Sequence, residues 1–160
     1  MAMHETSGQD IRKYLDTREQ GGQGAHAYAV LLGLRARDTE QLWARIGQGL
    51  SISAYERFQR NFELDTATLA GLLQTTLRTI ARRKKDGSLL PRESDRLLSV
   101  TRIFARALDL FEGDREAALV WLDTAQPSLG ERTPMEAIRT ELGTVEVERL
   151  IERLEQGVYG

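Results

Sequence analysis

Apolar side chains recur every three or four residues along most of this sequence, and proline is scarce. Tyr55, Phe58 and Phe62 show the spacing clearly, and the segment from Leu97 to Phe111 continues it. Three prolines in 160 residues leave long stretches in which nothing forces a helix to end. This period matches the roughly 3.6 residues per turn of an α-helix. Because no alternating, strand-like run is present, we predict an all-α fold.

Glycines, prolines and capping residues divide the sequence into separate helices. After a polar start, we expect helical segments at residues 25–34, 39–46, 53–62, 65–73, 76–85, 91–111, 114–122, 133–143 and 144–157. Ser53 and Asp65 are suitable N-caps, and Pro91 suits a first helical turn. Gly21–Gly24 is predicted to be a hinge or a flexible tip. At this length we expect one domain or two small ones.

Charge is distributed unevenly along the chain, although the formal net charge is only -2. Residues 66–108 hold 9 basic and 3 acidic side chains, whereas residues 109–160 hold 5 basic and 12 acidic ones. A phosphate responds to the local field, and the average over the chain is a poor guide to it. The basic centre is therefore a candidate for contact with nucleic acid.

Two short helices, 65–73 and 76–85, meet at a break at Gln74 and Thr75, which is the spacing of a helix-turn-helix motif. In the second helix Leu77, Ile80 and Ala81 are expected to face inward. The side chains predicted to contact DNA are Thr76, Arg78, Thr79, Arg82, Arg83, Lys84 and Lys85. The alternative is a solvated basic face that complements the negative end of the helix dipole.

The chain has few of the residue types that disulfides, metal sites and catalytic triads require. The chain has no cysteine and only two histidines, His4 and His26, so disulfides, metal sites and a catalytic triad are not expected. No apolar run reaches the roughly 18–20 residues that a bilayer span requires. The N-terminus does not resemble a secretion signal, so we expect a cytoplasmic protein without a cofactor. The acidic residues look like solvated helix faces, so an enzyme is not expected.

The C-terminal third is organised by caps and one apolar stripe. Thr133, Pro134 and Glu136 have the spacing of a capping box, Gly143 is expected to close that helix, and Thr144 to cap the last one. In the last helix the apolar positions are Val147, Leu150, Ile151, Leu154 and Val158. The chain then ends in an apolar and aromatic tripeptide, which docks either on its own core or on a partner.

The residues of this third resemble a known family. The pattern is that of the C-terminal toxin-binding domain of Xre/MbcA/ParS-type antitoxins, and it consists of Trp121-Leu122, Leu129-Gly130, Thr133-Pro134, Leu142-Gly143, Val147, Leu150-Ile151, Arg153-Leu154-Glu155 and Gly157-Val158-Tyr159. Upstream, residues 72–89 look like the Xre-type helix-turn-helix of the same proteins. Gly33-Leu34 and Gly49-Leu50-Ser51 resemble their N-terminal extensions. One departure is Glu131, since these domains often have a second glycine after the equivalent of Gly130.

The resemblance implies an Xre-like helix-turn-helix domain (residues 51–111), followed by a small helical toxin-binding domain (residues 112–160), with a helical N-terminal extension (residues 1–50). It implies an antitoxin of a type II toxin–antitoxin system, whose partner is a RES-domain toxin that destroys NAD. The last helix and tail would block the toxin's active site. The expected toxin-binding residues are Arg149, Leu150, Arg153, Leu154, Gln156, Gly157, Val158, Tyr159 and Gly160.

The same resemblance implies that the protein represses its own operon. A homodimer is expected because one recognition helix reads only half a site. Either residues 25–46 or the long helix near 92–111 could form the dimer interface. Two alternatives remain at this stage: a helix-turn-helix repressor without a toxin partner, and a toxin-binding adaptor whose helix-turn-helix serves only dimerisation.

Overall fold

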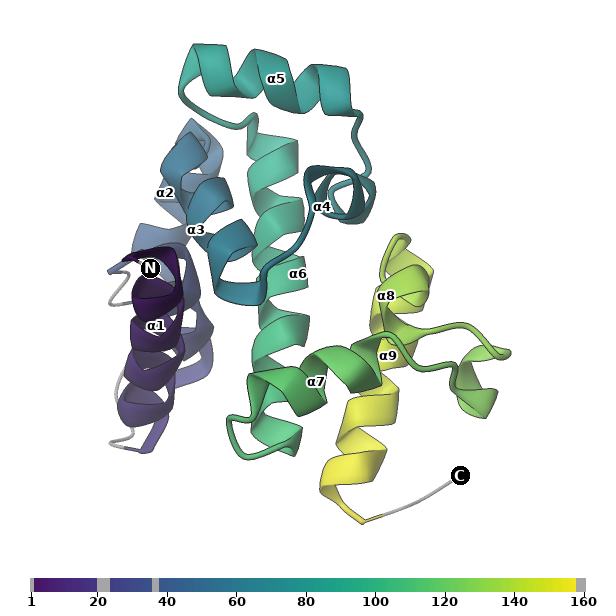
Figure 1. The fold of residues 1–160 in the computed structure, drawn as a ribbon. Coiled ribbons are helices and arrows are strands. Elements are labelled where there is room, and N and C mark those ends of the chain that lie inside the picture. The colour runs from purple at the N-terminus through teal and green to yellow at the C-terminus, as the bar shows by residue number, and fades with distance from the viewer. Residues whose placement is uncertain (1, 20–23, 36–37, 158–160) are drawn as a thin grey trace. The chain divides into compact units, whose positions relative to one another are not determined.

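The computed structural model describes residues 2–19, 24–35 and 38–157, and about three quarters of the chain is helical (Figure 1). Extended pairing among them is limited to two isolated bridges, Ser51 with Ser88 and Gln126 with Arg132. The all-α prediction is confirmed. In chain order the elements are α1 (Ala2–Glu19), the 3₁₀ helix η1 (Gly24–Leu32), α2 (Thr39–Gln48), α3 (Ile52–Phe62), α4 (Thr66–Leu72), α5 (Leu77–Asp86), α6 (Pro91–Leu110), α7 (Arg115–Leu122), the 3₁₀ helix η2 (Pro127–Leu129), α8 (Pro134–Ala137) and α9 (Glu141–Glu155).

The chain forms two compact units, residues 1–101 and residues 102–160. Unit 1 contains the elements from α1 to α5 and the first half of α6. Unit 2 contains the last turns of α6 and everything after it. None of the helices in the described ranges is long and apolar enough to cross a bilayer.

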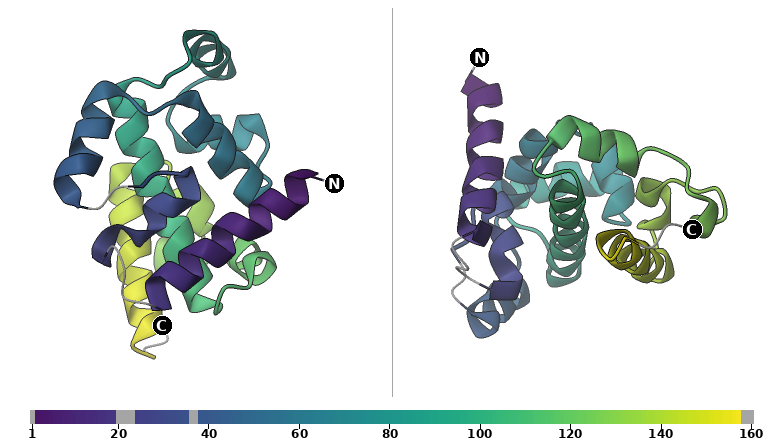
Figure 2. Two further views of the ribbon diagram at one scale, coloured as in Figure 1. Left: turned by 90° about the vertical axis from the view of Figure 1, so that its left-hand side faces the viewer. Right: turned by 90° about the horizontal axis from the view of Figure 1, so that it is seen from below.

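The core of unit 1 is built on the aromatic stripe of α3. Tyr55, Phe58 and Phe62 are fully or almost fully buried, as their spacing predicts. Helix α1 packs against η1 and α3 (Figure 2). This contact is fixed by a buried carboxylate, because Asp10 accepts two hydrogen bonds of 2.7 Å from Arg57 and one of 3.0 Å from Asn61. The sequence pattern did not reveal α1, in which Ile11 and Tyr14 are the buried apolar residues among those with described side chains.

Most of the predicted helix starts are confirmed. Asp65 accepts a hydrogen bond from the Thr68 amide, and Thr133 and Glu136 form the complete capping box. The apolar stretch at 25–34 is a 3₁₀ helix rather than an α-helix. The cap of α3 is Ser51, so the prediction of Ser53 was wrong by two residues. The predicted hinge at 21–24 falls mostly outside the described residues.

The boundary between the last two helices differs from the sequence prediction. The prediction that Gly143 closes one helix and Thr144 caps the next is wrong, because α9 already begins at Glu141 with Thr140 as its cap. Gly143 lies in the first turn of α9, where a Cβ atom would be 1.7 Å from the carbonyl oxygen of Ala137. The glycine is needed because α8 and α9 approach each other too closely for a side chain.

The loop around Gly130 retains a glycine-like backbone at the next residue. Gly130 has a φ of 65° and Glu131 a φ of 64°, both in the left-handed region that favours glycine. The departure from the family pattern therefore changes the side chain at this position and leaves the residue in a left-handed conformation. A glutamate held there stores about 1 kcal/mol or more of strain.

Candidate nucleic-acid and toxin interfaces

Helices α4 and α5 form the predicted helix-turn-helix. Helix α4 ends at Leu72, the chain turns at Gln74 with a φ of 57°, and Thr76 caps α5 by accepting a hydrogen bond of 3.1 Å from the Thr79 amide. Helix α5 lies at the outer end of unit 1 (Figure 1). Such a second helix, reached by a short turn, is the element that enters a major groove in helix-turn-helix proteins.

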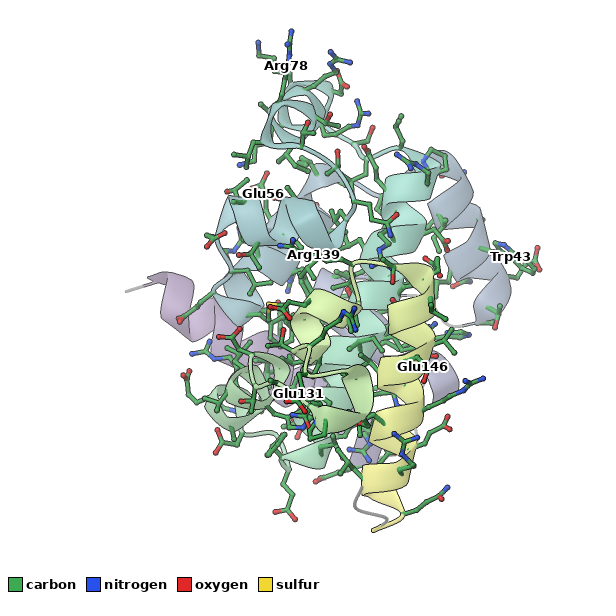
Figure 3. All side chains as sticks on the ribbon, turned by 90° about the vertical axis from the view of Figure 1, so that its right-hand side faces the viewer. Trp43, Glu56, Arg78, Glu131, Arg139 and Glu146 are labelled. Carbon is green, nitrogen blue, oxygen red and sulfur yellow. The ribbon has the colours of Figure 1, made fainter. Side chains whose placement is uncertain are left out.

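The outer face of α5 carries a row of exposed cations. Arg78 points away from the body of unit 1 (Figure 3), and Arg82, Lys84 and Lys85 are also exposed. Thr76 is exposed and Thr79 is half-buried. Since no acid lies between Thr66 and Lys85, the field over this face is positive. The arrangement suits contact with phosphates and with the acceptor atoms of guanine.

Three residues of α5 lie on the opposite side from the one predicted. Leu77 is 55 % exposed and Ala81 is exposed, whereas Arg83, expected on the outer face, is only 8 % exposed. The buried stripe of α5 consists of Ile80 and Arg83, which are three residues apart and so share one face. Position on the helix, rather than charge, decides which arginine faces outward.

Arg83 holds α5 to the start of α6. Its Nε donates a hydrogen bond of 2.7 Å to Glu93, and its Nη1 donates one of 3.4 Å to Asp86. Glu93 also accepts a hydrogen bond of 2.8 Å from the Leu90 amide. The hydrogen bond from Arg83 to Glu93 raises the pKa of the guanidinium further above its usual value. Arg83 therefore positions the helix whose other cations are exposed.

Of the two histidines, His26 has a described side chain. His26 Nε2 forms a hydrogen bond of 2.8 Å with Thr39 Oγ1. The side chain of His4 lies outside the described part of the chain. Within the described ranges, no group of three or more His, Cys, Asp or Glu side chains is placed to hold a metal ion.

In unit 2 the predicted toxin-binding residues divide into buried and exposed ones. Leu150 belongs to the core of the unit together with Val147 and Ile151. Arg153 and Leu154 are half-buried, whereas Arg149, Gln156 and Gly157 are exposed. Arg149 Nη1 donates a hydrogen bond of 2.9 Å to Glu146. The predicted contacts at Val158, Tyr159 and Gly160 lie outside the described residues.

Unit 2 also carries an apolar groove that the sequence pattern does not reveal. The groove measures about 430 Å³ and is lined by residues of η2, α8 and the start of α9, among them Leu129, Ala137 and Leu142. Leu142 is 74 % exposed at its rim. The spacing of Leu142 and Val145 in the sequence, off the buried stripe of α9, could have indicated an exposed apolar position. A side chain from another protein could fill this groove.

The fold and these two surfaces define a class: a helix-turn-helix protein with a second, C-terminal helical unit. Residues 44–102 match the sequence model of the antitoxin Xre-like helix-turn-helix domain. Residues 106–157 match that of the antitoxin Xre/MbcA/ParS C-terminal toxin-binding domain.

Two curated relatives are named Antitoxin Xre. The one from Yersinia enterocolitica is 33 % identical over 129 residues, which cover 80 % of this chain and 87 % of the relative. The one from Photorhabdus laumondii is 27 % identical over 128 residues, which cover 79 % of this chain and 86 % of the relative. This chain therefore belongs to the Xre antitoxin family, and the predicted resemblance is confirmed.

Proposed function

We propose that this protein is the antitoxin of a type II toxin–antitoxin system, that it neutralises a RES-type toxin that degrades NAD, and that it represses its own operon. The observation that carries the proposal is the combination, in one chain, of an exposed basic recognition helix with a domain of the toxin-binding family. It acts by binding, in the bacterial cytoplasm and on the nucleoid, and needs no cofactor.

The DNA-binding part of the proposal uses the exposed side chains of α5. Arg78 and Arg82 contact base edges or phosphates, Lys84 and Lys85 contact phosphates, and Thr76 and Thr79 lie at the start of the helix in the groove. A homodimer presents two such helices to a two-fold symmetric operator. If all four cations of each protomer neutralise phosphates, log K against log salt falls with a slope of up to about -7.

The DNA-binding part is tested by Arg82→Gln, with Arg12→Gln as its control. Arg12 is an exposed arginine on α1, away from the recognition helix, so its loss changes the net charge equally. We expect Arg82→Gln to weaken operator binding about tenfold or more and to raise expression of the operon, since one base or phosphate contact is lost. Equal operator binding by both variants would show that α5 is not part of the DNA interface.

The toxin-binding part of the proposal places the end of α9 and the tail over the NAD pocket of the toxin. Val147, Leu150 and Ile151 hold the helix from within unit 2, which leaves Arg149, Gln156, Gly157 and the following residues to meet the toxin. Val158 and Tyr159 can fill an apolar cleft. Arg153 and Leu154 are half-buried, and their exposed atoms complete the surface that meets the toxin.

Deleting Val158–Gly160 tests this blocking model. Cells that carry the toxin should lose NAD when the truncated chain replaces the full one, while the truncated chain still represses the operon because unit 1 is unchanged. Full protection of NAD by the truncated chain would contradict the model. If the full chain co-purifies with no neighbouring gene product and NAD never falls, the protein is a repressor without a toxin partner.

The apolar groove supplies a second docking point for the toxin, in addition to the tail. Leu142→Ser removes the exposed side chain at the rim of the groove. Val120→Ser is the matched control, because Val120 is 67 % exposed on α7 and does not line the groove. We expect Leu142→Ser to weaken toxin binding about tenfold and Val120→Ser to leave it unchanged. Equal affinities would exclude the groove from the interface.

A further inference from the structure

Two adjoining cavities lie in unit 1, on the side formed by α1, the end of η1, α2 and α3. One measures about 450 Å³ and is lined by the ends of η1 and α2 and the start of α3. The other measures about 330 Å³ and is lined by α1, the end of η1 and α3. They share Gly33, Leu34 and Arg57 as a common wall. Each is large enough for part or all of a small ligand.

The lining of both cavities is basic. Among the described residues that line them, five are cations, namely Lys13, Arg35, Arg45, Arg57 and Arg60, and none is acidic. Arg57 is paired with the buried Asp10, and the other four cations leave the concave surface with an excess of positive charge, which attracts an anion. Four of the five cations are arginines, whose planar guanidinium groups match the oxygens of phosphate. The expected ligand therefore carries phosphate and more than one negative charge.

Arg57, in the shared wall, is held in place before any ligand arrives. Its Nε and Nη2 each donate a hydrogen bond of 2.7 Å to Asp10. The side chain of Asp10 is only 4 % exposed, while that of Arg57 remains 39 % exposed. The hydrogen bond to Asp10 raises the pKa of Arg57. A fixed guanidinium with one side open to the cavities loses little freedom when it binds an anion.

The wall of the larger cavity is also connected to the recognition helix. Gly49, Leu50 and Ser51 line this cavity, and the same segment pairs with the residues just after α5. The Leu89 amide donates a hydrogen bond of 2.8 Å to Leu50, and the Ile52 amide donates one of 3.0 Å to Gly87, the C-cap of α5. A ligand that contacts this segment therefore acts on the residues that anchor the end of α5.

We propose that the two cavities form a site for a free, phosphate-bearing small molecule of about nucleotide size, and that its binding changes the affinity of α5 for DNA. The first half of this proposal stands independently of the antitoxin function. The second half rests on the proposed DNA binding.

The site is tested by calorimetric titration of the full chain with ADP and with inorganic pyrophosphate. Arg45→Gln removes a cation that lines only the larger cavity, and Arg12→Gln removes one that lines neither. We expect Arg45→Gln to weaken binding of both probes about tenfold, because one charged hydrogen bond is lost. Binding that is equal in the two variants, or too weak to detect at millimolar probe, would overturn the proposal.

DNA is the other source of phosphate for this surface, and a second measurement separates the two. If the cavities hold a free ligand, Arg45→Gln binds a random-sequence duplex as tightly as Arg12→Gln does. Weaker duplex binding by Arg45→Gln than by Arg12→Gln, together with no binding of either probe, would assign the cations to the DNA backbone and refute the site. If the unsubstituted chain binds pyrophosphate but no DNA at all, the proposed function fails while the site stands.

Discussion

The buried pair between Arg83 and Glu93 provides a quantitative test of how α5 is held. Removing Glu93 takes away the acceptor of two hydrogen bonds, one of 2.7 Å from Arg83 and one of 2.8 Å from the Leu90 amide. Loss of one partner of a buried pair costs about 3–5 kcal/mol, because the other charge is left without compensation. Arg83 retains its contact of 3.4 Å with the half-exposed Asp86, so we expect the lower value, about 3 kcal/mol, for Glu93→Leu.

The double substitution separates pairing from packing. Arg83→Met alone leaves the buried Glu93 without its cation and should lower the free energy of unfolding by a similar amount. The double variant, Arg83→Met with Glu93→Leu, removes both charges, and its free energy of unfolding should lie within about 1 kcal/mol of that of the unsubstituted protein. Urea unfolding followed by far-ultraviolet circular dichroism measures the free energies of unfolding of the four proteins. Additivity of the two single effects within about 0.5 kcal/mol would show that the charges are not coupled, and would refute the positioning role of Arg83.

Three further predictions have defined outcomes. Gly143→Ala places a Cβ atom 1.7 Å from the carbonyl oxygen of Ala137 and should lower the free energy of unfolding by about 2 kcal/mol or more, whereas Gly47→Ala in α2, with no atom within 4 Å, should raise it by about 0.5–1 kcal/mol. Thermal melting of the two variants measures both effects, and a stable Gly143→Ala would contradict the close approach. Glu131→Gly should raise the free energy of unfolding by up to about 1 kcal/mol by relieving the left-handed residue, and an unchanged or lower melting temperature would show that no strain is stored there. Burial raises the pKa of Tyr55 to about 12, so the unfolded chain releases the phenolic proton at a lower pH than the folded protein does. The free energy of unfolding should therefore fall between pH 10 and 12 relative to that of Tyr55→Phe. Equal losses of stability in the two proteins would contradict the shift.

The features that were predicted from the sequence are local ones. An N-cap depends on residues three positions apart, and an apolar stripe on residues three and four apart, so Asp65, Thr133 and the stripe of α3 could be identified along the chain. The two-helix motif followed from the same local rules. Helix α1 was missed because its apolar positions are sparse and its place is fixed by Asp10, whose partners are 47 and 51 residues away.

The errors in the candidate site have a similar origin. The charge pattern shows that α5 is basic, but only the fold reveals that Arg83 meets Glu93 at the start of the next helix. The same is true of Gly143, which a local rule assigns to a helix end and which the packing of α8 on α9 requires inside a first turn. The contacts of the toxin-binding residues with a partner, including those of the tail, stay predictions.

The bridge between Ser51 and Ser88 has a consequence for a genetic screen for loss of repression. At Gly49, a Cβ atom would lie 2.2 Å from the carbonyl oxygen of Leu89, so any side chain at this position pushes apart the segments that the bridge joins. Selection for derepressed colonies should therefore recover substitutions of Gly49 together with those of Arg78 and Arg82. Only the arginine alleles would be suppressed by compensating changes in the operator, because the glycine alleles damage the support of α5 and leave its contact residues intact.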